Sequence, residues 1–180
     1  AEPGKTTAFI GSTGCGKSTL VNLIPRFYDV TDGKITIDGK DIRNVSQHEL
    51  REKLGYVPQK AVLFSGDIAS NILYGNPDGS EAEMTEAATI AQATEFIEQK
   101  KKKYKSTISQ GGSNVSGGQK QRLSIARAIA KHPDIYIFDD SFSALDYKTD
   151  ATLRAKLKEK TSESTVMIVA QRISTILHAD

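Results

Sequence analysis

The chain has 180 residues, with 24 lysines and arginines against 22 aspartates and glutamates and a net charge of +2. That length suits one domain, which would bury roughly two-thirds of its unfolded surface, and the balanced charge argues against nucleic acid, whose binders usually carry a basic face. No stretch approaches the roughly eighteen apolar residues of a membrane-spanning helix, and the single cysteine, Cys15, excludes an intrachain disulfide and favours a reducing compartment.

The first residues predict a strand, a loop and a helix in immediate succession. Thr6–Ile10 is a short apolar run, and the glycine-rich stretch Gly11–Gly16 follows it directly. A helical pattern then begins at Lys17 and continues until Pro25 perturbs it. With the first strand so close to the first residue, we expect the chain to be part of something larger.

The next segment predicts a strand that ends in a turn, then a helix and another brief strand. Lys34–Ile37 alternates like a strand and ends in an Asp38-Gly39 turn. Ser46 and Glu49 form a capping-box pair that begins a helix. Gly55–Val57 is a brief strand that ends before Pro58 and Gln59.

Residues 60–116 differ in character and predict an inserted α-helical subdomain. Glu81–Gln99 is rich in alanine, glutamate and glutamine at helical spacing, and glycines mark loops around it. The run Lys100–Lys103 indicates a solvated helix end in preference to an anion-binding patch. We expect residues 1–59 and 117–180 to form the core around this insertion.

The last third predicts buried strands separated by helices. Ser116 caps a helix over Gly117–His132, the buried-strand patterns are Ile135–Phe138 and Thr165–Ala170, and a helix over Thr149–Lys160 lies between them. Strands without polar alternation indicate a mostly parallel sheet covered by helices on both faces, an α/β fold.

A phosphate-binding loop pattern joins the first strand and helix. It reads Gly11-Ser12-Thr13-Gly14-Cys15-Gly16-Lys17-Ser18, with Thr19 next in the helix. Glycines let the backbone curl so that its N–H groups point at phosphate oxygens, Lys17 supplies a charge for the β and γ phosphates, and Ser18 supplies a hydroxyl for Mg²⁺. The strand before and the helix after this stretch favour this reading over a glycine-rich turn with a surface lysine.

Two further motifs extend the site. Asp139 ends a buried strand, which brings a fixed carboxylate to the edge of the sheet where nucleotides bind and where it would hold Mg²⁺. Ser116-Gly117-Gly118-Gln119 begins a helix with free N–H groups and a hydroxyl, a second anion site. Standing alone, this motif would be an ordinary helix cap with flexible glycines.

Together these motifs resemble the ATP-binding cassette (ABC) family of P-loop NTPases, whose core is RecA-like, and the resemblance covers essentially the whole chain. It implies an ATPase domain whose signature, Ser116–Gln119, reaches the γ-phosphate on a second nucleotide-binding domain. Gln59 resembles the family's glutamine that touches Mg²⁺ and the attacking water, and Ser143–Asp146 resembles the segment that crosses the dimer interface. The stretch from Gly55 to Ile72 is similar to exporters, which implies a transmembrane partner and a place at the cytoplasmic face of the membrane.

Two residues depart from the family pattern at one site. Asp140 stands where the family usually has a catalytic glutamate, and Gln171 where it has a switch histidine. The aspartate carboxylate would lie about 1 to 1.5 Å further from the attacking water, and misplacement of that size can cost on the order of a hundredfold in rate. Gln171 has no titratable proton. The hypothesis is a site that binds ATP and hydrolyses it slowly, in a multidrug-type exporter with a non-identical partner.

Other readings stay open at the level of sequence. Asp140 can be a working base in a fully active homodimeric exporter, the chain can be a soluble cassette ATPase of DNA repair or translation, or it can be a regulatory module that does not turn over. Gln110 is a smaller departure, just upstream of the signature. The aromatic residue that stacks on adenine in the family is expected outside this chain.

Overall fold

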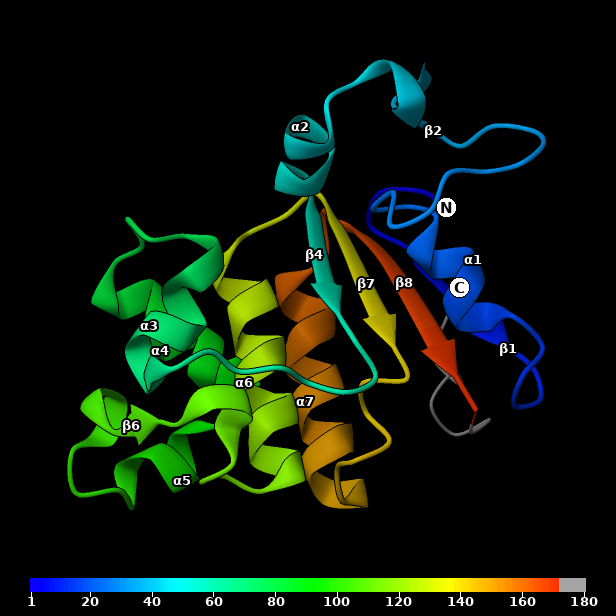
Figure 1. The fold of residues 1–180 in the computed structure, drawn as a ribbon. Coiled ribbons are helices and arrows are strands. Elements are labelled where there is room, and N and C mark those ends of the chain that lie inside the picture. Colours follow the sequence, from blue (N-terminus) through cyan, green and yellow to red (C-terminus); the bar gives the residue numbers. More distant parts are fainter. Residues whose placement is uncertain (172–180) are drawn as a thin grey trace.

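A four-stranded parallel sheet forms the centre of the molecule. The computed structural model describes residues 1–171, and Figure 1 shows β4, β7 and β8 running in the same direction. The strand order is β1-β8-β7-β4, with every neighbouring pair parallel. The bounds are β1 Thr6–Ile10, β4 Leu54–Val57, β7 Ile135–Asp139 and β8 Thr165–Ala170. The predicted α/β fold is confirmed.

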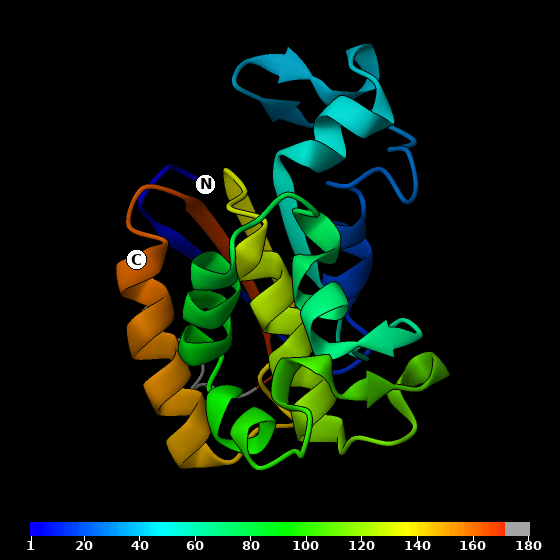
Figure 2. The same cartoon turned by 90° about the vertical axis from the view of Figure 1, so that its left-hand side faces the viewer.

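Two long helices cover one face of the sheet. α6, Gly117–Ala130, packs on β4 and on the helices of the inserted segment, while α7, Tyr147–Lys160, lies beside α4. Figure 2 views this helical layer from outside, with the sheet behind it. The buried residues of this layer form one continuous apolar core with Phe138 of β7 and Ile168 of β8.

The other face carries a smaller core under two short helices. α1, Lys17–Asn22, and α2, Gln47–Glu52, pack there against Ile135 and Ile137 of β7. The predicted capping box of α2 is present, since Glu49 N–H donates to the Ser46 hydroxyl and the Glu49 carboxylate accepts from Ser46 N–H. The strands β2, Thr36–Ile37, and β3, Lys40–Asp41, form an antiparallel hairpin around the predicted Asp38-Gly39 turn.

Residues 60–116 contain three short helices and a two-stranded ribbon. The helices are α3 Ile68–Ile72, α4 Glu81–Ile90 and α5 Thr94–Glu98, and the ribbon pairs β5 Gly66–Asp67 with β6 Thr107–Ile108. Their apolar side chains belong to the same core as α6 and the sheet. The division into a core and an inserted subdomain stays a prediction.

The single helix expected over Glu81–Gln99 is wrong, because the chain breaks at Gln92. Gln92 has φ 56°, and the N–H of Ala93 donates to the Ala88 carbonyl at 2.8 Å. A left-handed residue followed by a bond of this kind is the usual helix-ending Schellman arrangement. The break redirects the chain so that Phe96 and Ile97 reach the core. Composition alone gave no sign of it, because Gln and Ala are both good helix formers.

No helix among residues 1–171 is long and apolar enough to cross a membrane.

A buried amide holds the inserted segment together. Asn71 is 1% exposed, its Nδ2 donates to the carbonyls of Phe64 and Asp67 at 2.9 Å each, and its Oδ1 accepts from Phe64 N and from Arg127. Removing a buried hydrogen-bonding group leaves its partners unsatisfied and costs their desolvation.

We therefore expect Asn71→Ala to lower the free energy of unfolding by about 2 to 4 kcal/mol, measured by urea denaturation. The exposed Asn44→Ala is the control and should change it by less than about 0.5 kcal/mol. An equally small effect at Asn71 would show that this network contributes nothing to stability.

Candidate nucleotide site

The loop after β1 is shaped by two left-handed glycines. Gly14 has φ 82° and Gly16, the residue before α1, has φ 93°. A Cβ built on either glycine would meet no atom within 4 Å, so the space beside the loop is open. Lys17 folds back over this loop, and its Nζ donates to the carbonyls of Gly11 at 2.8 Å and Ser12 at 2.7 Å. The lysine is thus held beside the loop, and within residues 1–171 it forms no ion pair with a carboxylate.

A hydrogen bond joins the loop to the end of β7. Ser18 Oγ donates to Asp139 Oδ1 at 2.8 Å, although the two residues are far apart in sequence. Asp139 is only 4% exposed. Among residues 1–171, no lysine, arginine or histidine forms an ion pair with it. A buried carboxylate of this kind normally pairs with a cation or binds a metal.

The oxygen atoms at this point fit Mg²⁺. Two of the predicted metal residues, Ser18 and Asp139, are joined by the 2.8 Å hydrogen bond, whereas the Gln59 amide contacts Asp140. Hydroxyl and carboxylate oxygens are hard donors of the type Mg²⁺ prefers. The described part of the chain has no cluster of three or more His, Cys, Asp and Glu side chains. A site with so few protein donors suits a cation that keeps waters and takes further oxygens from substrate phosphates.

Asp140 lies between two glutamine amides. Its Oδ2 accepts from Gln59 Nε2 at 3.0 Å and from Gln171 Nε2 at 3.2 Å. The same Gln171 accepts through Oε1 from Thr13 Oγ1 of the phosphate loop at 3.4 Å. The loop after β4 and the end of β8 therefore meet at the carboxylate that follows β7, and the phosphate loop is joined to it through Gln171. The structure brings together the predicted catalytic residues Asp140, Gln171 and Gln59.

The signature residues begin α6 as expected but lie away from the phosphate loop. Ser116 and Gln119 form a capping box, and a Cβ on Gly117 would meet no atom within 4 Å. α6 packs against β4, whereas the phosphate loop follows β1 at the opposite edge of the sheet. Three strand spacings separate those edges, roughly 14 Å. The chain does not bring its own two anion sites together.

Two polar residues at this site, Tyr56 and Asn22, were not predicted as site residues from the sequence. Tyr56 OH donates to Asn22 Oδ1 at 2.8 Å and lies 3.4 Å from Asp139 Oδ2. Burial, and then the negative charge of Asp139, raise the pKa of Tyr56 well above its ordinary value, so the phenol stays neutral. Only the pairing of β4 with β7 reveals the contact, because Tyr56 lies opposite Ile137 in that register.

Comparison with known proteins gives a consistent identification. A model of the family described as ABC transporter matches residues 1–143. An ABC transporter ATP-binding protein of Mycobacterium tuberculosis is 49% identical over 183 residues, which cover 100% of this chain and 31% of that protein. A Staphylococcus aureus protein named as a multidrug export ATP-binding/permease protein is 46% identical, over 99% of this chain and 31% of its own length.

A solved structure agrees in three dimensions. The chain is similar to a bacterial Atm1-family ABC exporter with ATP bound, with a TM-score of 0.95 and 42% identity, over 98% of this chain and 31% of that one. The chain therefore belongs to the ABC transporter family, as an ATP-binding ATPase domain. It spans about a third of the length of the relatives it matches. The predicted family is confirmed.

Cys15 offers a chemical test of where the phosphates bind. Its thiol is exposed, lies within the phosphate loop and is 3.5 Å from Lys17 Nζ. A group attached to this sulfur would lie beside Gly11 and Lys17.

We expect alkylation of Cys15 to abolish ATP binding, and bound ATP to slow the alkylation, both followed by mass spectrometry and equilibrium binding. The variant Cys15→Ala treated with the same reagent is the control. Full ATP affinity after complete alkylation would place the phosphates elsewhere.

Proposed function

We propose that the chain hydrolyses ATP to ADP and phosphate in an export-type transporter, and that ATP drives its pairing with a second nucleotide-binding domain. The observation that carries the proposal is the Ser18–Asp139 hydrogen bond, which fixes a hydroxyl of the phosphate loop against a buried carboxylate. The names of the relatives, which include multidrug export and Atm1-family exporter, support the assignment to export.

ATP would be gripped by the loop amides from Gly11 to Thr19 and by Lys17. In the free chain Lys17 Nζ is bonded to the carbonyls of Gly11 and Ser12, so it would exchange these for β- and γ-phosphate oxygens. Ser18, Asp139 and Gln59 would hold Mg²⁺, which when bound neutralises phosphate charge and polarises the transferred group. The open space beside Gly14 and Gly16 leaves room for the phosphates.

Asp140 would accept a proton from the attacking water, with Gln59 and Gln171 holding its carboxylate in place. Both glutamines donate to the same oxygen, Oδ2, which fixes the orientation of the carboxylate. Gln171 reproduces the donor and the acceptor of a neutral imidazole but never becomes a cation. With a base one methylene shorter as well, we propose slow hydrolysis at this site.

The signature would act on the site of the partner domain. Ser116–Gln119 is complete and capped, Gly117 faces open space, and its own phosphate loop lies at the other edge of the sheet. A second nucleotide-binding domain placed head to tail would supply the missing half of each site. A weak site beside an intact signature fits a non-identical partner, and Ser143–Asp146 would lie at the same junction, since a Cβ on Gly118 comes 3.4 Å from the Ala144 carbonyl.

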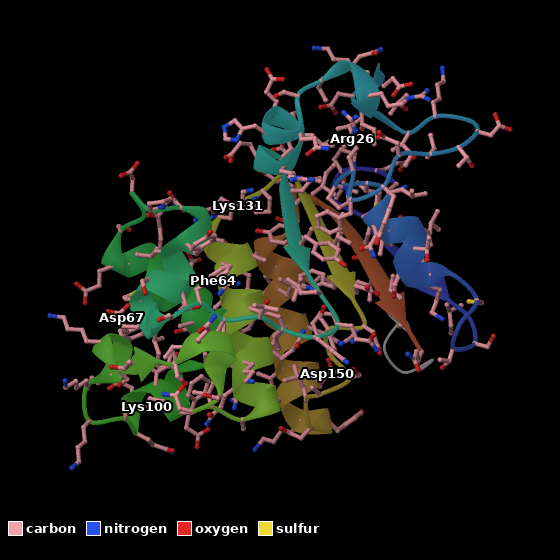
Figure 3. The ribbon with its side chains drawn as sticks, in the orientation of Figure 1. Arg26, Phe64, Asp67, Lys100, Lys131 and Asp150 are labelled. Carbon is pink, nitrogen blue, oxygen red and sulfur yellow. The ribbon has the colours of Figure 1, made fainter. Side chains whose placement is uncertain are left out.

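A transmembrane partner at the cytoplasmic face of the membrane fits an exposed aromatic surface. Phe64 and Tyr74 stack with ring centroids 4.3 Å apart and are 41% and 59% exposed. Figure 3 shows Phe64 on the helical side of the molecule, beside α6. Arg127 of α6 lies 4.9 Å from the Phe64 ring centroid, so this surface is joined to the helix that begins at the signature. The inserted segment, residues 60–116, would carry it as a unit.

The soluble cassette ATPase is the alternative function. It would share the phosphate loop and Asp139, but the export and permease names of the relatives favour the transporter.

Lys17 is the simplest test of ATP binding. In the intact protein we expect Lys17→Ala to weaken ATP binding at least tenfold, because the charge facing the β and γ phosphates is lost. Equilibrium binding of a fluorescent ATP analogue measures it. Lys101→Ala, an exposed lysine far along the chain, is the control and should bind normally. Equal affinities in the two variants would contradict the proposed site.

The double variant Asp140→Glu with Gln171→His tests the slow site. We expect hydrolysis at this site to rise about tenfold to a hundredfold, because the longer base again reaches the water. Site-resolved single-turnover measurement in the assembled transporter is needed, and Asp140→Asn is the matched control that should show no gain. Unchanged hydrolysis in the double variant, with intact ATP binding, would refute the slow-site hypothesis while leaving ATP binding in place.

A further inference from the structure

The Asp139 carboxylate contacts only two side-chain hydroxyls within residues 1–171. Ser18 Oγ donates to Oδ1 at 2.8 Å, and Tyr56 OH lies 3.4 Å from Oδ2. The serine belongs to the phosphate-loop motif, whereas the tyrosine lies in the exporter-like stretch from Gly55 to Ile72 and was given no role at the site. The two hydroxyls address different oxygens, so together they fix the rotation of the carboxylate about its Cβ–Cγ bond.

The sheet places Tyr56 where its hydroxyl can do this. β4 and β7 are parallel neighbours with Tyr56 opposite Ile137, and Figure 1 shows the two strands side by side. Side chains alternate between the two faces of a strand, so Asp139 shares with Ile137 the face covered by α1. A tyrosine one residue pair behind Asp139 is long enough to reach its carboxylate along that face.

The tyrosine ring is itself held by neighbours from outside the sheet. Phe27 meets it edge to face, with centroids 5.4 Å apart and planes at 89°. The Tyr56 hydroxyl has one proton and shares it in a three-centre hydrogen bond between Asn22 Oδ1 at 2.8 Å and Asp139 Oδ2 at 3.4 Å. Asn22 follows Ser18 by four residues on α1, one helical turn later on the same side. The phenol therefore bridges the helix of the phosphate loop and the strand of the carboxylate.

We propose that Tyr56 is a positioning residue for the metal-binding carboxylate: it holds Asp139 in the rotamer that directs Oδ1 at Ser18, and through Asn22 it locks β7 to α1. This inference rests on the proposed function, in which Ser18 and Asp139 hold Mg²⁺. Tyr56 does not touch the metal or the phosphates, and it acts only through Asp139 and Asn22. Tyr56 therefore affects the affinity of the site for Mg²⁺ and leaves the affinity of the loop for phosphate unchanged.

The variant Tyr56→Phe isolates the hydroxyl, because the ring and its contact with Phe27 remain. In the intact transporter we expect the Mg²⁺ concentration that half-saturates Mg²⁺-dependent ATP binding to rise about fivefold to tenfold, the worth of one hydrogen bond. ATP affinity measured in EDTA should stay unchanged. A fluorescent ATP analogue titrated with MgCl₂ gives both values.

Tyr136→Phe is the matched control. Tyr136 is a buried tyrosine on β7 whose side chain packs on the opposite face, parallel to Phe138. This variant also loses a tyrosine hydroxyl from the same sheet. The Mg²⁺ concentration that half-saturates its ATP binding should equal that of the unmodified protein.

Two outcomes would overturn the inference. One is an unchanged Mg²⁺ half-saturation in Tyr56→Phe, and the other is an equal loss of ATP affinity with and without Mg²⁺, which a purely structural role would give. The variant Asp139→Asn distinguishes a failure of this inference from a failure of the proposed function. If Asp139→Asn removes the Mg²⁺ dependence while Tyr56→Phe leaves it intact, only the role of Tyr56 fails; if Asp139→Asn leaves it intact, the metal site itself is wrong.

Discussion

A buried carboxylate without a basic partner is the constraint on which the rest of the site depends. Asp139 is taken out of water by the sheet and the helices around it, and the described residues compensate its charge only with hydroxyls. Removing an uncompensated anion from water is costly, so a cation bound to this carboxylate would stabilise the folded site. The phosphate loop, through Ser18, is attached to that carboxylate, which ties phosphate binding to metal binding.

The sequence carried the parts of the site that depend on local chemistry. The glycines and Lys17 define the phosphate loop because its spacing is set by the backbone around a phosphate, and the apolar run before Asp139 predicts a buried strand with the carboxylate at its end. The caps of α2 and α6 follow from pairs three residues apart. These features need no knowledge of distant residues. The strand that ends at Asp139 and the two caps lie where the pattern placed them, and the phosphate-binding role of the loop stays a prediction.

What the sequence could not supply depends on register and on tertiary contact. Tyr56 reaches Asp139 only because β4 pairs with β7 in one register, and the shared hydrogen bonding of Gln59 and Gln171 to Asp140 joins three segments that are far apart in the chain. The break at Gln92 arises because the following turn gains buried contacts, which outweigh the helical preference of Gln and Ala. Tertiary packing determines these features, and local propensity alone does not predict them.

The most direct test is a structure of the intact transporter with a non-hydrolysable ATP analogue and Mg²⁺. We predict that residues 11–18 surround the triphosphate and that a metal ion lies between Ser18 Oγ and the Asp139 carboxylate. We also predict that Ser116–Gln119 faces the γ-phosphate of the nucleotide bound to the other domain. A nucleotide bound elsewhere, or one in this loop whose metal has no contact with Ser18 or Asp139 either directly or through water, would contradict the central claim.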